Sequence, residues 1–186
     1  IKLKNDDQLQ WVDNCRYLGV YFVKGRTFSC SFSNAKKNFY KSFNSVYSKI
    51  GRFASEEVVL NLLNVKCMSS LLYGTEVCPM LSRHKHSLDF VVTRVFMKIL
   101  YTRSAAVVEE CQRYFSFLPS RYRIDIRTAR FLDRFIATTN IVCSSFYVEA
   151  RRQLIDILLK YGIMDVSKSC MLPNKIFKAF VNGELK

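Results

Sequence analysis

The stretch CRYLGVYF, residues 15–22, is rich in aromatic and β-branched side chains, and a basic, aromatic run from Phe32 to Phe53 follows it. Aromatic and β-branched residues favour strands. We therefore expect two short strands over residues 9–13 and 17–23, joined near residues 14–15. Together they predict a small β-hairpin near the N-terminal end.

Downstream of this hairpin the hydrophobic pattern changes from that of strands to that of helices. Lys24-Gly25-Arg26 predicts a turn, residues 28–32 predict a third strand or an extended lead-in, and helical periodicity begins at Ser33. The first helix collects apolar side chains on one face at helical spacing, namely Phe39, Phe43, Val46, Ile50 and Phe53.

Further helices are expected along the rest of the chain, separated by short breaks. Ser55 and Ser104 each precede an apolar run and are predicted N-caps, and Pro119 predicts a subdomain boundary. The expected helices cover residues 58–72, 86–101, 105–115, 122–139, 145–160 and 173–180. The predicted fold class is mainly α, a helical bundle with a small N-terminal β-hairpin.

The charge balance of the chain is strongly basic. Its 186 residues include 29 Lys and Arg against 15 Asp and Glu, a formal net charge of +14. Such a field favours a polyanionic partner, either nucleic acid or an acidic membrane surface, although a basic surface also confers solubility. No signal peptide or apolar run long enough to span a membrane is present in the sequence, so no membrane partner is expected.

The cysteines and histidines do not suggest a metal or catalytic site. Seven cysteines are widely spaced, none of them in a CxxC pair, and only His84 and His86 are available to complete a zinc set. The spacing and apolar neighbours predict reduced thiols in an intracellular, cytoplasmic or nuclear protein. Neither a nucleophile–base set nor a phosphate-binding glycine loop is recognisable, so no cofactor is expected in this chain.

Two basic surfaces are candidate nucleic-acid contacts. The first helix carries Lys36, Lys37, Lys41, Lys49 and Arg52, each able to neutralise a phosphate. The competing interpretation is the solvated face of an ordinary amphipathic helix.

The second basic surface is a stripe of arginines at helical spacing, made of Arg123, Arg127, Arg130 and Arg134. The forked guanidinium group suits contacts with phosphate oxygens. Asp125 and Asp133 are close enough in sequence to pair with these arginines, which would make the stripe a set of surface ion pairs. The sequence leaves both interpretations open.

Two short motifs, YLGV at residues 17–20 and LLYGTE at residues 71–76, resemble segments of the reverse transcriptases of non-LTR (LINE-type) retrotransposons. In that family a YLGV-like hairpin closes the palm as the primer grip, and a YG-x-E element lies in the helical thumb that follows. The segments AKKNFY (residues 35–40) and GRFASEE (residues 51–57) are similar to thumb helices of the same family. Cys78 departs from the family, in which an aromatic residue is common at this place.

The resemblance implies a division into the end of a palm with the primer-grip hairpin (residues 1–33), a helical thumb (34–118) and a helical connector (119–186). Tyr17, Leu18, Gly19 and Val20 would line the 3′ end of the primer. The helix over residues 36–52 would lie along the RNA/DNA template–primer duplex. The implied partners are this duplex and the remainder of the polymerase.

The catalytic aspartates of the family would lie upstream of Ile1, where the sequence starts as if cut from a longer protein. Mg²⁺ is therefore expected only in the missing palm, and this chain alone is expected to be inactive as an RNA-directed DNA polymerase. The alternative function is that of a helical protein-interaction or RNA-binding remnant of such an element, without a role in polymerisation.

Overall fold

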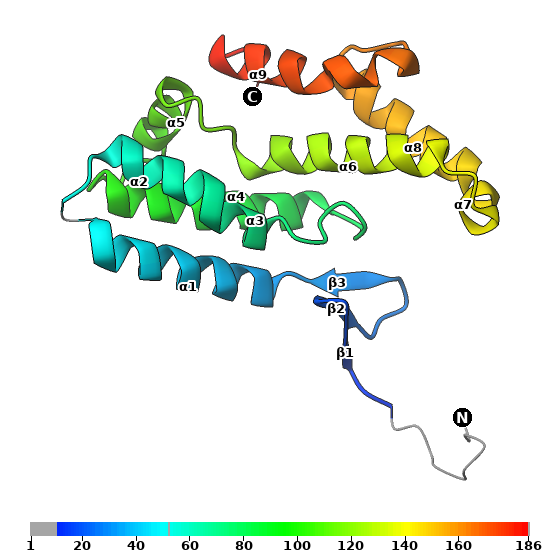
Figure 1. Cartoon of the computed structure of the whole chain (residues 1–186), viewed down its shortest axis with the longest axis horizontal. Coiled ribbons are helices and arrows are strands. Elements are labelled where there is room, and N and C mark those ends of the chain that lie inside the picture. Colours follow the sequence, from blue (N-terminus) through cyan, green and yellow to red (C-terminus); the bar gives the residue numbers. More distant parts are fainter. Residues whose placement is uncertain (1–10, 52, 186) are drawn as a thin grey trace.

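The structure is a computed structural model that describes residues 11–51 and 53–185, and it is mainly helical with a small antiparallel sheet at the N-terminal end (Figure 1). The predicted fold class is confirmed. The strands of the sheet are β1 (Asn14–Tyr17), β2 (Val20–Val23) and β3 (Ser29–Ser31), in the order β1-β2-β3.

The hairpin turn lies at Leu18-Gly19, so the prediction of one strand over residues 17–23 is wrong. Tyr17 pairs with Val20, and the two residues between them have φ of 46° and 81°. Positive φ at both central positions defines the tight turn whose twist matches that of the flanking strands. The first expected strand lies partly outside the described residues, and residues 11–13 precede β1.

The chain reverses after β2 through Lys24-Gly25-Arg26, as predicted, and β3 leads directly into α1 (Ser33–Ile50). Phe39 and Phe43 of α1 are buried, as the helical spacing indicates. Phe53, the last residue of the expected apolar face, is 90 % exposed because α1 ends at Ile50.

The next helical stretch begins after Ser55, the predicted N-cap, whose backbone is extended. It runs through α2 (Glu56–Leu62), the π-helical segment η1 (Leu63–Cys67) and α3 (Met68–Leu71). The Ser55 side chain makes no capping hydrogen bond.

Two more helices complete the first hydrophobic core. They are α4 (Ser82–Ile99) and α5 (Ala105–Tyr114), and the Ser104 hydroxyl accepts a hydrogen bond from the Val107 N–H at 3.4 Å, as an N-cap does. The largest buried side chains of this core include Phe39, Phe43, Leu63, Met68 and Phe96, which come from α1, η1, α3 and α4.

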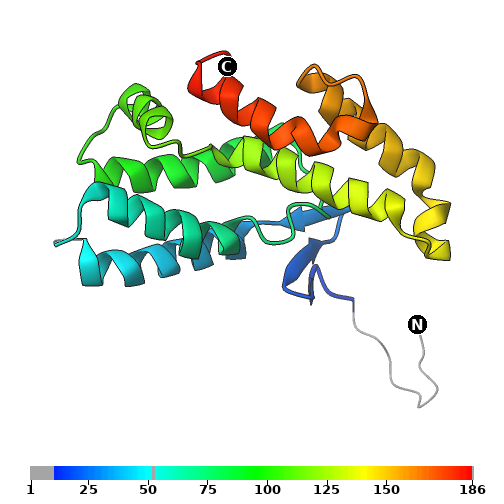
Figure 2. The ribbon, with the colours of Figure 1, turned by 45° about the horizontal axis from the view of Figure 1, so that its top comes forward.

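The remaining helices form a second layer over α4 (Figures 1 and 2). They are α6 (Ser120–Ala137), α7 (Ile141–Ser145), α8 (Tyr147–Lys160), the 3₁₀ segment η2 (Val166–Met171) and α9 (Leu172–Val181). Their apolar side chains make a second core that includes Leu132, Leu154, Leu158, Leu172 and Ile176. The division of the chain into palm, thumb and connector remains a prediction.

The buried carboxylate of Asp125 on α6 joins the two layers. It accepts hydrogen bonds from Lys85 Nζ of α4 at 2.5 Å, from Lys160 Nζ of α8 at 2.6 Å and from the Tyr161 hydroxyl at 2.6 Å. Burial raises the pKa of Asp125, but these three hydrogen bonds outweigh burial, and the pKa lies below its ordinary value of 3.8. The same carboxylate thus holds together elements that are far apart in sequence.

Candidate nucleic-acid interface

The hairpin tip is held in place by the segment that follows α3. The Tyr73 hydroxyl donates a hydrogen bond to the Leu18 carbonyl at 2.9 Å. A Cβ on Gly19 would lie 3.1 Å from Tyr73 Cε1, and a Cβ on Gly74 would lie 2.8 Å from Val20 Cγ2. The close packing of Tyr73 against the tip and of Val20 against Gly74 therefore depends on both glycines. The YLGV and YGTE motifs, 55 residues apart in sequence at this hydrogen bond, are in direct contact.

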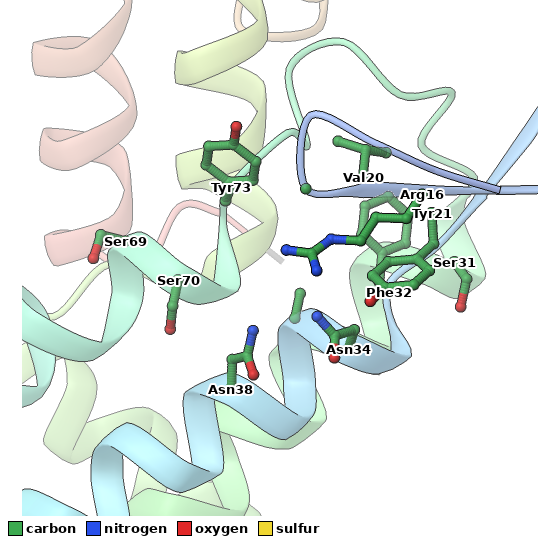
Figure 3. Close-up of a pocket in the computed structure, with 12 residues that line it drawn as sticks. Arg16, Val20, Tyr21, Ser31, Phe32, Asn34, Asn38, Ser69, Ser70 and Tyr73 are labelled. Atoms are coloured by element: carbon green, nitrogen blue, oxygen red, sulfur yellow. The ribbon is translucent and has the colours of Figure 1, made fainter.

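A cavity of about 400 Å³ lies between the hairpin, the start of α1 and α3 (Figure 3). The Arg16 side chain extends into it from β1 and faces Asn34 and Asn38 of α1, while Ser69 and Ser70 lie on the far wall. Guanidinium and amide groups are donors suited to phosphate and sugar oxygens. No carboxylate of the described residues lies within ion-pair distance of Arg16. The cavity is therefore a polar site with one fixed positive charge.

Exposed apolar and aromatic side chains lie at the hairpin tip and on Tyr73, which holds the tip. Tyr17 is 61 % exposed, Leu18 73 % and Tyr73 55 %. Tyr73 lines the cavity directly, as do Gly19 and Val20. Aromatic faces next to a cationic donor are typical of surfaces that contact sugars and bases. All four predicted primer-contacting residues lie at this tip.

The predicted lysines of α1 do not share one face. Lys37 and Lys41 are exposed along one ridge, and Lys49 is exposed a quarter-turn further round the helix. Lys36 faces α4, where its Nζ donates to the Ser87 hydroxyl at 2.6 Å. Arg52 lies outside the described residues. Because α1 contains no Asp or Glu, Lys37 and Lys41 have no acidic neighbour on their own helix.

Two arginines of the α6 stripe have partners within the protein. Arg123 donates to the Leu118 carbonyl at 2.6 Å and to Asn64 Oδ1 at 2.5 Å, and it stacks on Phe117. Burial lowers the pKa of Arg123 to about 10. Arg127 binds both carboxylate oxygens of Glu76, at 2.8 Å and 3.3 Å.

Arg130 and Arg134, the other two residues of the stripe, are exposed and line a cavity of about 270 Å³ with Asp133. Of the two interpretations that the sequence left open, pairing of the stripe with Asp125 does not occur, because that carboxylate turns toward Lys85 and Lys160. The structure thus separates one stripe into two arginines that connect elements and two that face solvent.

A second groove, which the sequence reasoning missed, runs between α1 and α4. It encloses about 540 Å³ and is lined by Tyr40, Asn44, Arg94, Lys98 and Arg103, among others. Lys98 Nζ donates to Asn44 Oδ1 at 3.3 Å and lies 5.1 Å from the centre of the Tyr47 ring. The i, i+4 spacing of Arg94 and Lys98 was the available signal. The sequence did not indicate Arg16 as a site residue, because a single arginine in a strand forms no recognisable spacing with other basic residues.

Other functional signals are weak within the described parts of the chain. No group of three or more His, Cys, Asp or Glu residues there is arranged to hold a metal ion. All seven cysteines are free thiols, and burial raises the pKa of Cys67. None of the described helices combines the length and hydropathy that crossing a membrane requires.

Comparison of the chain with protein-family models, curated proteins and solved structures found no match in any of the three.

Proposed function

We propose that the chain holds an RNA/DNA template–primer duplex as part of an RNA-directed DNA polymerase of the non-LTR retrotransposon type. The hairpin tip and the Arg16 cavity would receive the recessed 3′ end of the primer. Helix α1 would lie along the duplex backbone. The observation that supports this proposal is the contact of the YLGV tip with the YGTE element through Tyr73 and Leu18. These are the two segments on which the resemblance rests.

The surface chemistry fits a grip that does not depend on sequence. Lys37 and Lys41 present ammonium groups to phosphates, and Arg16 with Asn34 and Asn38 presents donors in a concave site. Phosphate contacts of this kind position a duplex without reading its bases. Arg123 and Arg127, whose donors are used inside the protein, would support this surface and not touch the duplex. Bond formation would use metal-bound aspartates in the rest of the polymerase.

Reversing the charge of the α1 ridge tests the duplex contact. In the double variant Lys37→Glu, Lys41→Glu we expect affinity for a fluorescent RNA/DNA primer–template to fall at least about tenfold at moderate salt. The slope of log Kd against log salt concentration should decrease by about 2, because two phosphate contacts are lost. Circular dichroism should show unchanged helicity, since both side chains are exposed.

The matched control is Lys168→Glu, Lys178→Glu, which changes net charge equally on η2 and α9, across the molecule from α1 (Figures 1 and 2). Its affinity should change much less. If both double variants lose the same affinity, only the overall field attracts the duplex, and the assignment to α1 is wrong.

Arg16→Ala tests the role of the cavity at the hairpin. We expect wild-type protein to prefer a recessed 3′ end over a blunt duplex, and the variant to lose most of this preference while keeping salt-sensitive binding. Competition between the two duplexes measures the preference. Arg26→Ala, an exposed arginine in the loop before β3, is the control and should retain it. If Arg16→Ala keeps the preference for a recessed 3′ end, the primer end does not bind in this cavity.

An exposed apolar patch supports a second candidate function, binding of a protein partner. At the turn from α7 into α8, Ile141 is 82 % exposed, Val142 61 %, Phe146 60 % and Val148 79 %. Adjacent exposed apolar residues of this kind mark interaction surfaces. The duplex titration separates the two functions: absence of duplex binding at low salt would favour the protein-interaction function.

A further inference from the structure

A cavity of about 450 Å³ lies on the other side of the α1 N-terminus from the Arg16 cavity, between β3, α1 and α4. Three of its lining residues carry cationic or imidazole groups: Lys36, Arg83 and His84. Four more carry hydroxyls, namely Ser29, Ser31, Ser33 and Ser87. None of the described lining residues is acidic. This composition matches an oxyanion and excludes a cation as its ligand.

Hydrogen bonds inside the cavity leave donors available. Lys36 Nζ donates to Ser87 Oγ at 2.6 Å, so the Ser87 hydroxyl proton and two ammonium protons remain for a ligand. The Ser33 N–H, the first of α1, points at Ser31 Oγ at 3.4 Å, a long contact that an anion can replace.

His84 contributes a donor without a partner. Its Nε2 accepts a hydrogen bond from Arg83 Nε at 3.5 Å, which places the ring proton on Nδ1. That Nδ1 is buried and has no hydrogen-bond partner among the described residues. A buried donor without an acceptor is destabilising, and a bound oxyanion in the cavity that His84 lines would supply the acceptor.

Two long helices begin at this cavity, α1 at Ser33 and α4 at Ser82. Neither helix has a side-chain hydrogen bond at its N-cap. The positive ends of both helix dipoles therefore add to the field of Lys36 and Arg83. Basic side chains, hydroxyls and helix ends converge here from segments about 50 residues apart.

We propose that this cavity binds a terminal phosphate group, carried either by inorganic phosphate or by a 5′-phosphorylated nucleotide. Lys36 and Arg83 neutralise the charge, and Ser33, Ser87 and His84 donate hydrogen bonds to the oxygens. The site is separate from the exposed α1 ridge, because Lys37 lies about 100° further round the helix than Lys36. It does not depend on duplex binding.

The experiment is isothermal titration of the chain with inorganic phosphate and, separately, with adenosine 5′-monophosphate, at constant ionic strength. Wild-type protein should bind one equivalent with Kd on the order of 1 mM or tighter. The double variant Lys36→Met, Arg83→Met should bind at least about tenfold more weakly. Ser87→Ala keeps both charges and should weaken binding less, which preserves the test if the double variant does not fold. Lys37→Met, one residue away, is the matched control and should bind phosphate like wild type.

Equal binding in wild type, the double variant and Ser87→Ala would overturn the proposal, as would absence of saturable binding in wild type. Tighter binding of the monophosphate than of inorganic phosphate identifies the nucleotide as the source of the group. Equal affinities identify free phosphate. Loss of duplex binding in Lys37→Met with retained phosphate binding would separate this site from the proposed polymerase surface.

Discussion

Replacing Asp125 with alanine is expected to lower the free energy of unfolding by about 3 kcal/mol, because it leaves buried and half-buried donors without their acceptor. Lys85 and Lys160, now without a counter-ion, would repel each other, and the buried Tyr161 hydroxyl would lose its partner. This decrease lies at the lower end of the range usual for removing one partner of a buried ion pair, because the Lys160 side chain is 55 % exposed. Equilibrium unfolding in urea, followed by circular dichroism, measures it.

Asp133→Ala, on the solvent face of the same helix, is the control and should change stability by less than about 0.5 kcal/mol. Adding Lys85→Met to Asp125→Ala should recover part of the loss, since one unpaired ammonium group is removed. If Asp125→Ala lowers the free energy of unfolding no more than Asp133→Ala does, the Asp125 contacts do not hold the two layers together.

The Asp125 contacts also predict a pH dependence. The pKa of Asp125 is lower in the folded than in the unfolded chain, so its stabilisation is present above the unfolded value, near 3.8, and is lost as pH falls through the folded value. The melting temperature of the wild type should therefore fall more steeply below about pH 4 than that of Asp125→Ala. Parallel curves would contradict this assignment.

Gly74→Ala is expected to destabilise the attachment of the hairpin by about 2 kcal/mol, the second large effect. Gly74 has φ of 73°, which disfavours any residue with a Cβ, and the new Cβ would lie 2.8 Å from Val20 Cγ2. Hydrogen exchange at the amides of β2, together with urea unfolding, reports the loss. Preference for a recessed primer end should fall as well, since the Tyr73 contact with the tip is displaced.

Gly25→Ala is the matched control, because its φ is not in the left-handed region and the nearest atom to the new Cβ would be the Thr27 carbonyl oxygen, at 3.3 Å. Combining Gly74→Ala with Val20→Ala removes the clash but not the backbone strain, so stability should recover only in part. Exchange rates in β2 that stay unchanged in Gly74→Ala would show that the tip does not need this contact.

The helical framework was predictable from the sequence because its determinants are local. The spacing of Phe39 and Phe43 identifies the buried face of α1, and Ser104 identifies the start of α5. The basic ridge of Lys37 and Lys41 followed from the same periodicity. The failures at this level are of two kinds. Phe53 extends the pattern beyond the residue where α1 stops, and the short helix α7 lies in a segment for which no helix was expected.

The turn at Leu18-Gly19 could not be placed by local reasoning. Leucine disfavours a positive φ, and the contact that holds it there, from the Tyr73 hydroxyl, comes from 55 residues away. The Arg16 cavity depends on the same long-range contact, since its walls belong to the hairpin, α1 and α3.

The sequence by itself determined which segments become helices, which faces they bury and where positive charge accumulates, because these properties follow from neighbours three or four residues apart. Only the tertiary structure decided what each charge does. Arg123 and Arg127 belong to one stripe with Arg130 and Arg134, yet Asn64 and Glu76 hold the first two inside the protein. Asp125 likewise binds Lys85 and Lys160 and not the arginines near it in sequence. In each case the packing of distant helices sets which partners lie within hydrogen-bonding distance.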